Sequence, residues 1–384
     1  MSILSPEQLK IKQATKEFVA KYIIPYADEY DKSGEFHPYL LEAAKESNIF
    51  AMAIPKEYGG LGYDAMTQAV VLEEWGYGCA GMGTTLAASI LSMDSIEVAG
   101  NDAQKKHFYA PMLKAEIGSF GLTEPGAGSD AGSAKTTAIK QGNEYIINGT
   151  KCWITNGGYA KVFVIYALTD PTAGMKGLSA FIVDRGTPGF TIGAPDHKLG
   201  IRSSSTVELM FKDVHIPASN LVGKEGEGMK IAMKTLDMAR PAIAALSVGI
   251  AQRALDECVK HVQQRFPGKP PAGQALQFKL ADMAIQIDGA RQSLYEAMQL
   301  RDAGVPYSKE SAICKTLCGD TCMALTSMAV SLMGSYGYTH LGKYMRDSKI
   351  MQIYEGTNQI QRLVISRAVL TPAAAQTTAQ KAGK

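Results

Sequence analysis

The chain changes its hydrophobic periodicity twice, and this feature constrains the fold most. In residues 1–117, apolar side chains recur three and four positions apart, as in LKIKQATKEFVAKYI, which is typical of amphipathic helices. Between about 119 and 225, short segments alternate apolar and polar residues, as strands do. From about 226 onward the helical spacing returns. The pattern predicts a helical region, a β region and a second helical region.

The 384 residues are too many for one simple core. We therefore predict an α+β multidomain protein divided into 1–118, 119–228 and 229–370, followed by a disordered tail over 371–384. Strands and helices do not alternate regularly along the chain. This order argues against a doubly wound nucleotide-binding domain.

Local signals place some boundaries within these regions. Ser5 followed by Pro6 predicts the start of the first helix, with Ser5 as its N-cap. Gly142-Asn143 lies between two alternating segments and predicts a β-hairpin. Pro241 lies within a long helical pattern, where we expect a bend or a break.

Composition excludes several classes of protein. The net charge is +2 and no long basic run occurs, so there is no electrostatic case for nucleic-acid binding. The sequence contains no stretch of about 18 uninterrupted apolar residues, so it predicts no membrane span. The N-terminus lacks a signal-peptide pattern, and the six cysteines fit a reducing compartment, so we expect a cytoplasmic protein. Cys314, Cys318 and Cys322 have no histidine nearby, and we expect buried thiols rather than a metal site.

The segment IYEGTNQIQR, residues 353–362, places Glu355 within an apolar run. Ile350, Met351, Ile353 and Tyr354 precede it. The glutamate either caps a helix or is a base shielded from water by these neighbours. Shielding would raise its pKa and strengthen it as a base.

The segment GLTEPGAGSD, residues 121–130, is rich in glycine and hydroxyl groups. Its Gly126, Gly128 and Gly132 do not have the spacing of a dinucleotide fingerprint. The segment is either an ordinary turn or a loop whose backbone N–H groups approach a ligand closely.

The segment KCWITNGG, residues 151–158, contains one of only two tryptophans, Trp153. On a strand, Trp153 and Thr155 would point to the same face. Trp153 is either a core residue or, together with Thr155, a platform that stacks on and hydrogen-bonds to a flat polar ring.

Five segments in this order resemble the acyl-CoA dehydrogenase family over almost the whole chain. They are IPKEYGGLGYD, GLTEPGAGSD, KCWITNGG, LDMARP and MRDSKIMQIYEGTNQIQRL. The resemblance implies an N-terminal helical domain, a middle β-barrel-like domain and a C-terminal four-helix bundle. It also implies FAD bound between domains and across a subunit interface, a homotetramer, oxidation of acyl-CoA to trans-2-enoyl-CoA, and electron-transferring flavoprotein as the acceptor.

The resemblance also assigns roles residue by residue. Glu355 matches the catalytic base. Substrate contacts are implied for Ser129, Asp237, Arg240 and Gly356. FAD contacts are implied for Phe120, Leu122, Thr123, Gly128, Trp153, Ile154, Thr155, Arg265, Gln274, Gly334, Thr357 and Gln359.

Two segments depart from the family pattern. SLMGS, residues 331–335, has Ser331 and Ser335 where the family often has glutamine and glycine. QQRFPGKP, residues 263–270, is shortened and contains Pro267. Both departures concern FAD contacts that reach a neighbouring subunit, including those of Arg265.

The helix matched by residues 83–96 forms part of the acyl pocket in the family. No Lys or Arg occurs between Lys56 and Lys105, so a carboxylate on the acyl group would lack a partner there. We therefore predict a neutral acyl group. Asp94 is either a helix-surface acid or a polar group in the pocket that suits a cyclic or atypical acyl chain.

Other activities share these residues. An enoyl-CoA reductase runs the same chemistry in the opposite direction. An acyl-CoA oxidase is disfavoured because oxidases are usually longer. A non-catalytic scaffold of the same fold would lack bound flavin or turnover.

Overall fold

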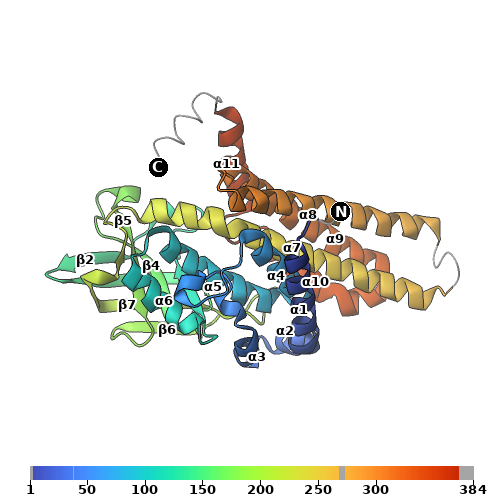
Figure 1. Ribbon diagram of the computed structural model, residues 1–384, viewed down its shortest axis with the longest axis horizontal. Helices are drawn as coiled ribbons and strands as arrows, with labels where there is room; N and C mark the ends of the chain where they lie inside the picture. Colours follow the sequence, from blue (N-terminus) through green and yellow to red (C-terminus); the bar gives the residue numbers. More distant parts are fainter. Residues whose placement is uncertain (1–2, 38, 268–272, 372–384) are drawn as a thin grey trace.

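A computed structural model describes residues 3–37, 39–267 and 273–371 of the protein (Figure 1). The sheet lies at one end of the molecule, and the longest C-terminal helices extend from it to the opposite end. The order of helices, sheet and helices confirms the predicted α+β multidomain architecture. Most of the tail predicted to be disordered, 372–384, lies outside the described residues.

The N-terminal region is helical. Its helices are α1 (Pro6–Tyr22), α2 (Ala27–Ser33), α3 (Tyr39–Ser47), α4 (Ala65–Gly78), α5 (Ala80–Ala99) and α6 (Asp102–Met112). The predicted N-cap is confirmed, because the Ser5 side chain accepts a hydrogen bond from the Gln8 N–H in a capping box. Helices α4 and α5 are buried on nearly all sides because they pack against the C-terminal helices as well as their own neighbours.

The middle region forms one sheet. Its strands are β1 (Gly118–Gly121), β2 (Thr137–Gln141), β3 (Glu144–Thr155), β4 (Val162–Leu168), β5 (Leu178–Asp184), β6 (Phe190–Pro195), β7 (Thr206–Pro217) and β8 (Leu221–Val222). They are ordered β6-β7-β3-β2-β4-β5-β8, and β1 pairs in parallel with β4. The predicted hairpin at Gly142-Asn143 is confirmed as the antiparallel pair β2–β3.

The C-terminal region is helical again. Its helices are α7 (Gly228–Arg265), α8 (Gln274–Asp302), α9 (Ser308–Met333), α10 (Gly342–Ile350) and α11 (Asn358–Leu370), with a π-helical turn at Gly337–Leu341. The break considered at Pro241 does not occur, since Pro241 lies inside α7, which is 38 residues long. Proline leaves the carbonyl four residues earlier without its helical donor. Here the Ser311 hydroxyl donates to that carbonyl, on Asp237, at 2.8 Å.

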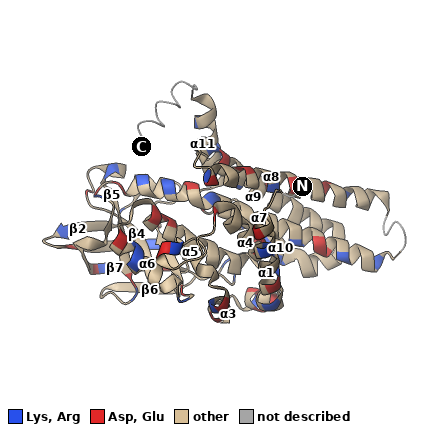
Figure 2. Ribbon diagram, viewed as in Figure 1, with Lys and Arg blue, Asp and Glu red and all other residues tan. Residues whose placement is uncertain are grey.

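One stretch, Ser308–Ile350, is long and apolar enough to cross a membrane by length and composition alone. It contains α9, which packs against α7, α8 and α11. Packing inside the helical region therefore accounts for its apolar character. All six cysteines are buried free thiols, which confirms the predicted burial of Cys314, Cys318 and Cys322. Figure 2 shows acidic and basic residues interspersed over the molecule, in keeping with the small net charge.

Candidate active site

Glu355 lies in the short turn between α10 and α11. Glu355 and Gly356 both have left-handed backbones, with φ of 53° and 89°. The helix-cap interpretation of Glu355 is wrong, because Thr357 is the N-cap of α11 and its hydroxyl accepts from the Ile360 N–H at 3.2 Å. A left-handed non-glycine residue persists only where its surroundings hold it.

The carboxyl group of Glu355 is shielded from water. The pKa of Glu355 is raised to about 8, and burial is the largest cause of this shift. Its Oε2 atom is buried and has no hydrogen-bond partner among the described residues. Ile353 does not provide the predicted shield, since it is 45% exposed. The Ile353 side chain is turned toward solvent, whereas Met351 is fully buried.

Three charged side chains act on Glu355 from three different helices. Lys315 of α9 and Arg240 of α7 lower its pKa, and Asp94 of α5 raises it. Burial dominates all three. The site is therefore a carboxylate with a buried Oε2 atom, surrounded by charges of both signs.

The surface interpretation of Asp94 is wrong. Asp94 is only 4% exposed, and its Oδ2 has no hydrogen-bond partner among the described residues. Its Oδ1 lies 3.9 Å from Nη2 of Arg301, which comes from α8. Burial raises the pKa of Asp94 to about 6. Helix α5 is enclosed by α4, α7 and β1, and this enclosure excludes the surface position, which was one of the two alternatives that the sequence left open for Asp94.

The GLTEPGAGSD and KCWITNGG segments are joined by a buried ion pair. Lys151 Nζ donates to Glu124 Oε1 at 2.7 Å and to the Leu122 carbonyl at 3.0 Å. Glu124 also accepts from the N–H groups of Lys135 and Thr136, at 2.7 and 3.0 Å. These contacts fix the first half of the loop. Its second half is open, since Gly128 and Ser129 are exposed and nothing lies near a Cβ built on Gly128.

Trp153 is not a core residue. It is 64% exposed, and its backbone is left-handed with φ of 56° at an irregularity in the β3–β7 pairing. Ile154 beside it is buried, and Thr155 is partly buried. A strained backbone that exposes a large ring is typical of a binding site.

Helix α5 connects the two halves of the site. The Thr85 carbonyl accepts from Asn156 Nδ2 at 2.9 Å, next to the Trp153–Thr155 segment. The adjacent Thr84 hydroxyl lies 3.3 Å from the Tyr354 hydroxyl, next to Glu355. The fold thereby brings the KCWITNGG and IYEGT segments to one end of the same helix.

The residues matched to substrate contacts lie on α7 and in the turn. Arg240 is 4% exposed and pairs with Asp237, and Arg240 Nε lacks a hydrogen-bond partner among the described residues. The Gly356 carbonyl accepts from Gln361 Nε2 at 2.9 Å.

The remaining positions matched to FAD lie in three different segments. Phe120 lies in β1 and is partly buried, and Gln359 is exposed on α11. The Thr123 carbonyl accepts a hydrogen bond from the Cys152 N–H at 3.0 Å.

Arg265, Gln274 and Gly334 gather away from Glu355. Arg265 ends α7, Gln274 begins α8 and Gly334 follows α9, so all three lie at the far end of the helical region in Figure 1. The stacked rings of His261 and Tyr336, whose centroids lie 3.9 Å apart, join the last turns of α7 to the segment that follows α9. All three predicted residues are exposed. Within one chain they do not join the site around Glu355.

Sequence reasoning missed the partners of the buried charges. Lys315, Arg301 and the Glu124–Lys151 pair were not predicted. A signal existed for Lys315, because it shares a helical stripe with Ser311, Cys318 and Cys322, all of which are buried. The stripe places a lysine inside, where only a polar site accommodates it.

The residues present fit a bound flavin nucleotide. The exposed Trp153 ring offers a stacking surface, and the open glycine loop leaves backbone groups accessible. Asn156 Oδ1 is buried without a partner among the described residues, as expected of a group that a ligand completes.

Family models match the three regions of the chain in order. The acyl-CoA dehydrogenase N-terminal domain matches residues 5–116, the middle domain 119–214 and the C-terminal domain 226–370. The chain belongs to the acyl-CoA dehydrogenase family. It is an acyl-CoA dehydrogenase-type oxidoreductase.

Similar proteins include one named as a reductase and one named as a dehydrogenase. Acryloyl-CoA reductase (NADH) of Anaerotignum propionicum is 43% identical, over 96% of this chain and 95% of that protein. The structure of butyryl-CoA dehydrogenase from Megasphaera elsdenii has a TM-score of 0.93 and 38% identity, covering 97% of this chain and 100% of that one. A structure described as electron transferring flavoprotein of Acidaminococcus fermentans, towards a mechanism of flavin-based electron bifurcation, contains a chain with a TM-score of 0.94 and 42% identity over 97% and 100%.

Proposed function

We propose that this protein is an FAD-dependent dehydrogenase that converts a neutral acyl-CoA thioester to the trans-2-enoyl-CoA. The observation that carries the proposal is the Glu355 carboxyl group. Its Oε2 atom is buried and has no partner among the described residues, and burial raises its pKa to about 8. A desolvated carboxylate is a stronger base than a solvated one, as removal of a weakly acidic α-proton requires.

Glu355 removes the α-proton of the thioester. The Glu355 N–H has no hydrogen-bond acceptor among the described residues, so it is left to donate to the thioester oxygen as negative charge develops there. When bound, FAD supplies the acceptor for the β-hydrogen as hydride. Lys315 and Arg240 offset the negative charge of the turn.

The remaining predicted residues hold the two ligands. The loop from Phe120 to Gly128, the Trp153–Thr155 segment, Thr357 and Gln359 would contact FAD. Ser129, Asp237, Arg240 and Gly356 would contact the acyl-CoA. The Glu124–Lys151 pair supports this assignment because it fixes the loop against the tryptophan segment.

A neutral acyl group is supported by Asp94. An acyl carboxylate near α5 would meet this buried acid, and the nearby Arg301 is already 3.9 Å from Asp94. Similarity to butyryl-CoA dehydrogenase favours a short chain. We expect butyryl-CoA to be a better substrate than glutaryl-CoA in parallel assays, and a preference for glutaryl-CoA would refute this part of the proposal.

Physiological reduction of an enoyl-CoA is a second candidate. The similarity to acryloyl-CoA reductase favours it, and the same base would then return the proton to the α-carbon. Rates measured in both directions with donors of known potential would separate the two.

Partners follow from the same comparisons and from the geometry. Arg265, Gln274 and Gly334 lie away from Glu355, which supports FAD contacts to a neighbouring subunit and a homo-oligomer, here proposed as a tetramer. The flavoprotein-linked relative supports electron-transferring flavoprotein as the electron acceptor. The cytoplasmic location stays a prediction, favoured by the free thiols.

An anaerobic visible spectrum of the purified protein tests the proposal. We expect a flavin band that is bleached by butyryl-, octanoyl- or cyclohexanecarbonyl-CoA, but not in Glu355→Gln. A colourless protein that FAD does not reconstitute would instead favour the non-catalytic scaffold.

A further inference from the structure

Lys315 of α9 is a buried cation without a carboxylate partner. Its exposed fraction is 0%, as is that of Lys151, and Lys343 is 9% exposed. Lys151 pairs with Glu124 and Lys343 pairs with Asp347. No ion pair joins Lys315 to a carboxylate among the described residues. Burying an ammonium group without one is costly, and this burial lowers the pKa of Lys315 to about 8, so its positive charge is held below that pH.

Lys315 binds the turn that carries Glu355. Its Nζ donates to the Gly356 carbonyl at 2.8 Å and to Asn358 Oδ1 at 2.9 Å. Asn358 is itself held, because its Nδ2 donates to Asp320 Oδ1 at 2.8 Å. The lysine thus contacts the turn immediately after the glutamate, at the second of two left-handed residues.

The unpaired cation and the unpaired carboxylate complement each other. After burial, Lys315 is the largest influence on the pKa of Glu355, and Glu355 is the largest influence on the pKa of Lys315. Yet the two groups form no ion pair, and Oε2 of Glu355 stays free. A direct ion pair would occupy the oxygen that has to accept a proton.

We infer that Lys315 is a positioning residue for the base: it anchors the turn through Gly356 and Asn358, and its charge favours ionised Glu355 without occupying the carboxylate. The inference rests on the proposed function. It goes further because it assigns part of the positioning of the base to α9, whereas the sequence motifs indicate only the IYEGT segment.

The other charges around Glu355 fix the sign of the effect. Asp94 of α5 opposes ionisation, Arg240 of α7 favours it, and Arg240 is already paired with Asp237. Without the Lys315 charge, less positive charge offsets the effect of Asp94 on Glu355. The pKa of Glu355 should then rise, and the pH at which activity is half-maximal should rise with it.

Lys315→Met and Lys315→Gln in the full-length protein test the inference. Methionine keeps much of the length without charge or donor, and glutamine keeps a donor without charge. Lys309→Met is the matched control, because Lys309 lies on the same helix with its side chain 44% exposed. Each variant is assayed for kcat, KM and the pH dependence of kcat/KM, and by hydrogen exchange of residues 351–360.

For Lys315→Met we expect a kcat about tenfold lower, a smaller change in KM, and a pH midpoint higher by about one unit. We also expect faster exchange in the turn while α9 stays protected. Lys315→Gln should shift the midpoint with less effect on exchange, and Lys309→Met should match the wild type.

Wild-type pH midpoints and exchange in both folded variants would overturn the inference. So would the failure of both to fold while Lys309→Met folds, because Lys315 would then serve stability alone. If the wild type turns over no acyl-CoA, the proposed function fails, whereas exchange in the turn still reports whether Lys315 holds it.

Discussion

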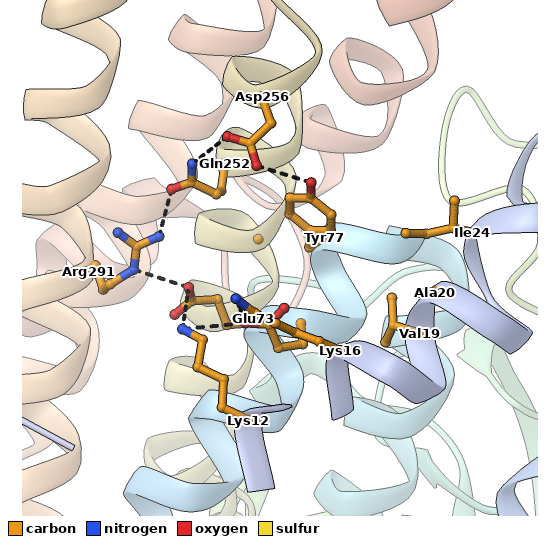
Figure 3. A pocket seen from close by; sticks show the side chains of 12 residues that line it. Lys12, Lys16, Val19, Ala20, Ile24, Glu73, Tyr77, Gln252, Asp256 and Arg291 are labelled. Atoms are coloured by element: carbon orange, nitrogen blue, oxygen red, sulfur yellow. Dashed lines mark hydrogen bonds and ion pairs between the residues drawn. The ribbon is translucent and has the colours of Figure 1, made fainter. Parts of the chain in front are cut away.

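Glu73 of α4 and Glu355 are both shielded from water, but their surroundings differ. Glu73 lines a pocket of about 400 Å³ between α1, α4, α7 and α8 (Figure 3). Its Oε1 accepts from Arg291 Nε at 3.1 Å, and Lys12 lies 3.6 Å away. Its Oε2 accepts from the Tyr295 hydroxyl at 3.4 Å. Both oxygens are occupied by groups of the same chain.

The rest of that pocket is paired in the same way. Arg291 also donates to Gln252, Gln252 donates to Asp256, and the Tyr77 hydroxyl donates to Asp256 as well (Figure 3). The network joins helices from both helical regions of the chain. A buried charge that is fully paired holds the structure together and has no oxygen left for chemistry.

At the other site, oxygens of two carboxylates lack partners. Oε2 of Glu355 and Oδ2 of Asp94 are buried and unpaired among the described residues. Groups of this kind lower the stability of the fold and mark places where a ligand completes the pairing. The contrast suggests that pairing, rather than burial, separates a structural carboxylate from a reactive one.

Glu355→Gln should have the largest effect on activity. We expect turnover to fall on the order of 10³-fold, because the amide cannot take the proton. Steady-state assays with butyryl-CoA measure the loss, and circular dichroism checks that the variant is folded. Retention of more than a tenth of the wild-type rate would assign the proton transfer to another group.

Glu73→Gln should show the opposite behaviour. We expect a loss of about 3 kcal/mol in the free energy of unfolding, because Arg291 and Lys12 lose their carboxylate partner. Urea denaturation measures this, with the exposed Glu17→Gln on α1 as a control expected to change stability by less than about 0.5 kcal/mol. Turnover per folded molecule should stay near the wild-type value, and a large fall would remove the distinction between the two sites.

The pH dependence of activity should report the raised pKa of Glu355. Because only the ionised carboxylate accepts a proton and its pKa is about 8, kcat/KM should rise about tenfold per pH unit below that value and level off above it. A profile measured from pH 6 to 10 checks this. A flat profile above pH 6 would mean that Glu355 is already ionised in the active enzyme.

The smallest effect concerns stability. The pKa of Glu355 is raised from 4.5 to about 8 in the folded state, so between these values the folded state holds more protons than the unfolded state. Wild-type stability should therefore fall as pH rises from about 4.5 to 8. Glu355→Gln lacks this penalty and should exceed the wild type by at least about 1 kcal/mol at pH 9.

Thermal unfolding at pH 5 and pH 9 measures this difference. The advantage of Glu355→Gln should be larger at pH 9. An advantage that does not change with pH would show that ionisation of Glu355 does not strain the fold.

Sequence alone predicted those features that depend on neighbouring residues. The Ser5 cap, the hairpin at Gly142-Asn143 and the order of helical and β regions are confirmed. Each rests on periodicity or turn chemistry within a few residues. The apolar run before Glu355 likewise suggested a shielded carboxylate, although Ile353 does not provide the shield.

Only the tertiary structure decided which charge meets which. Lys315 reaches the Glu355 turn, Lys151 reaches Glu124, and Arg301 approaches Asp94 across helices distant in sequence. Periodicity places a residue on the inner face of a helix, but it does not specify the side chain opposite. That side chain depends on how whole elements pack, and with it whether a buried charge is paired or free to react.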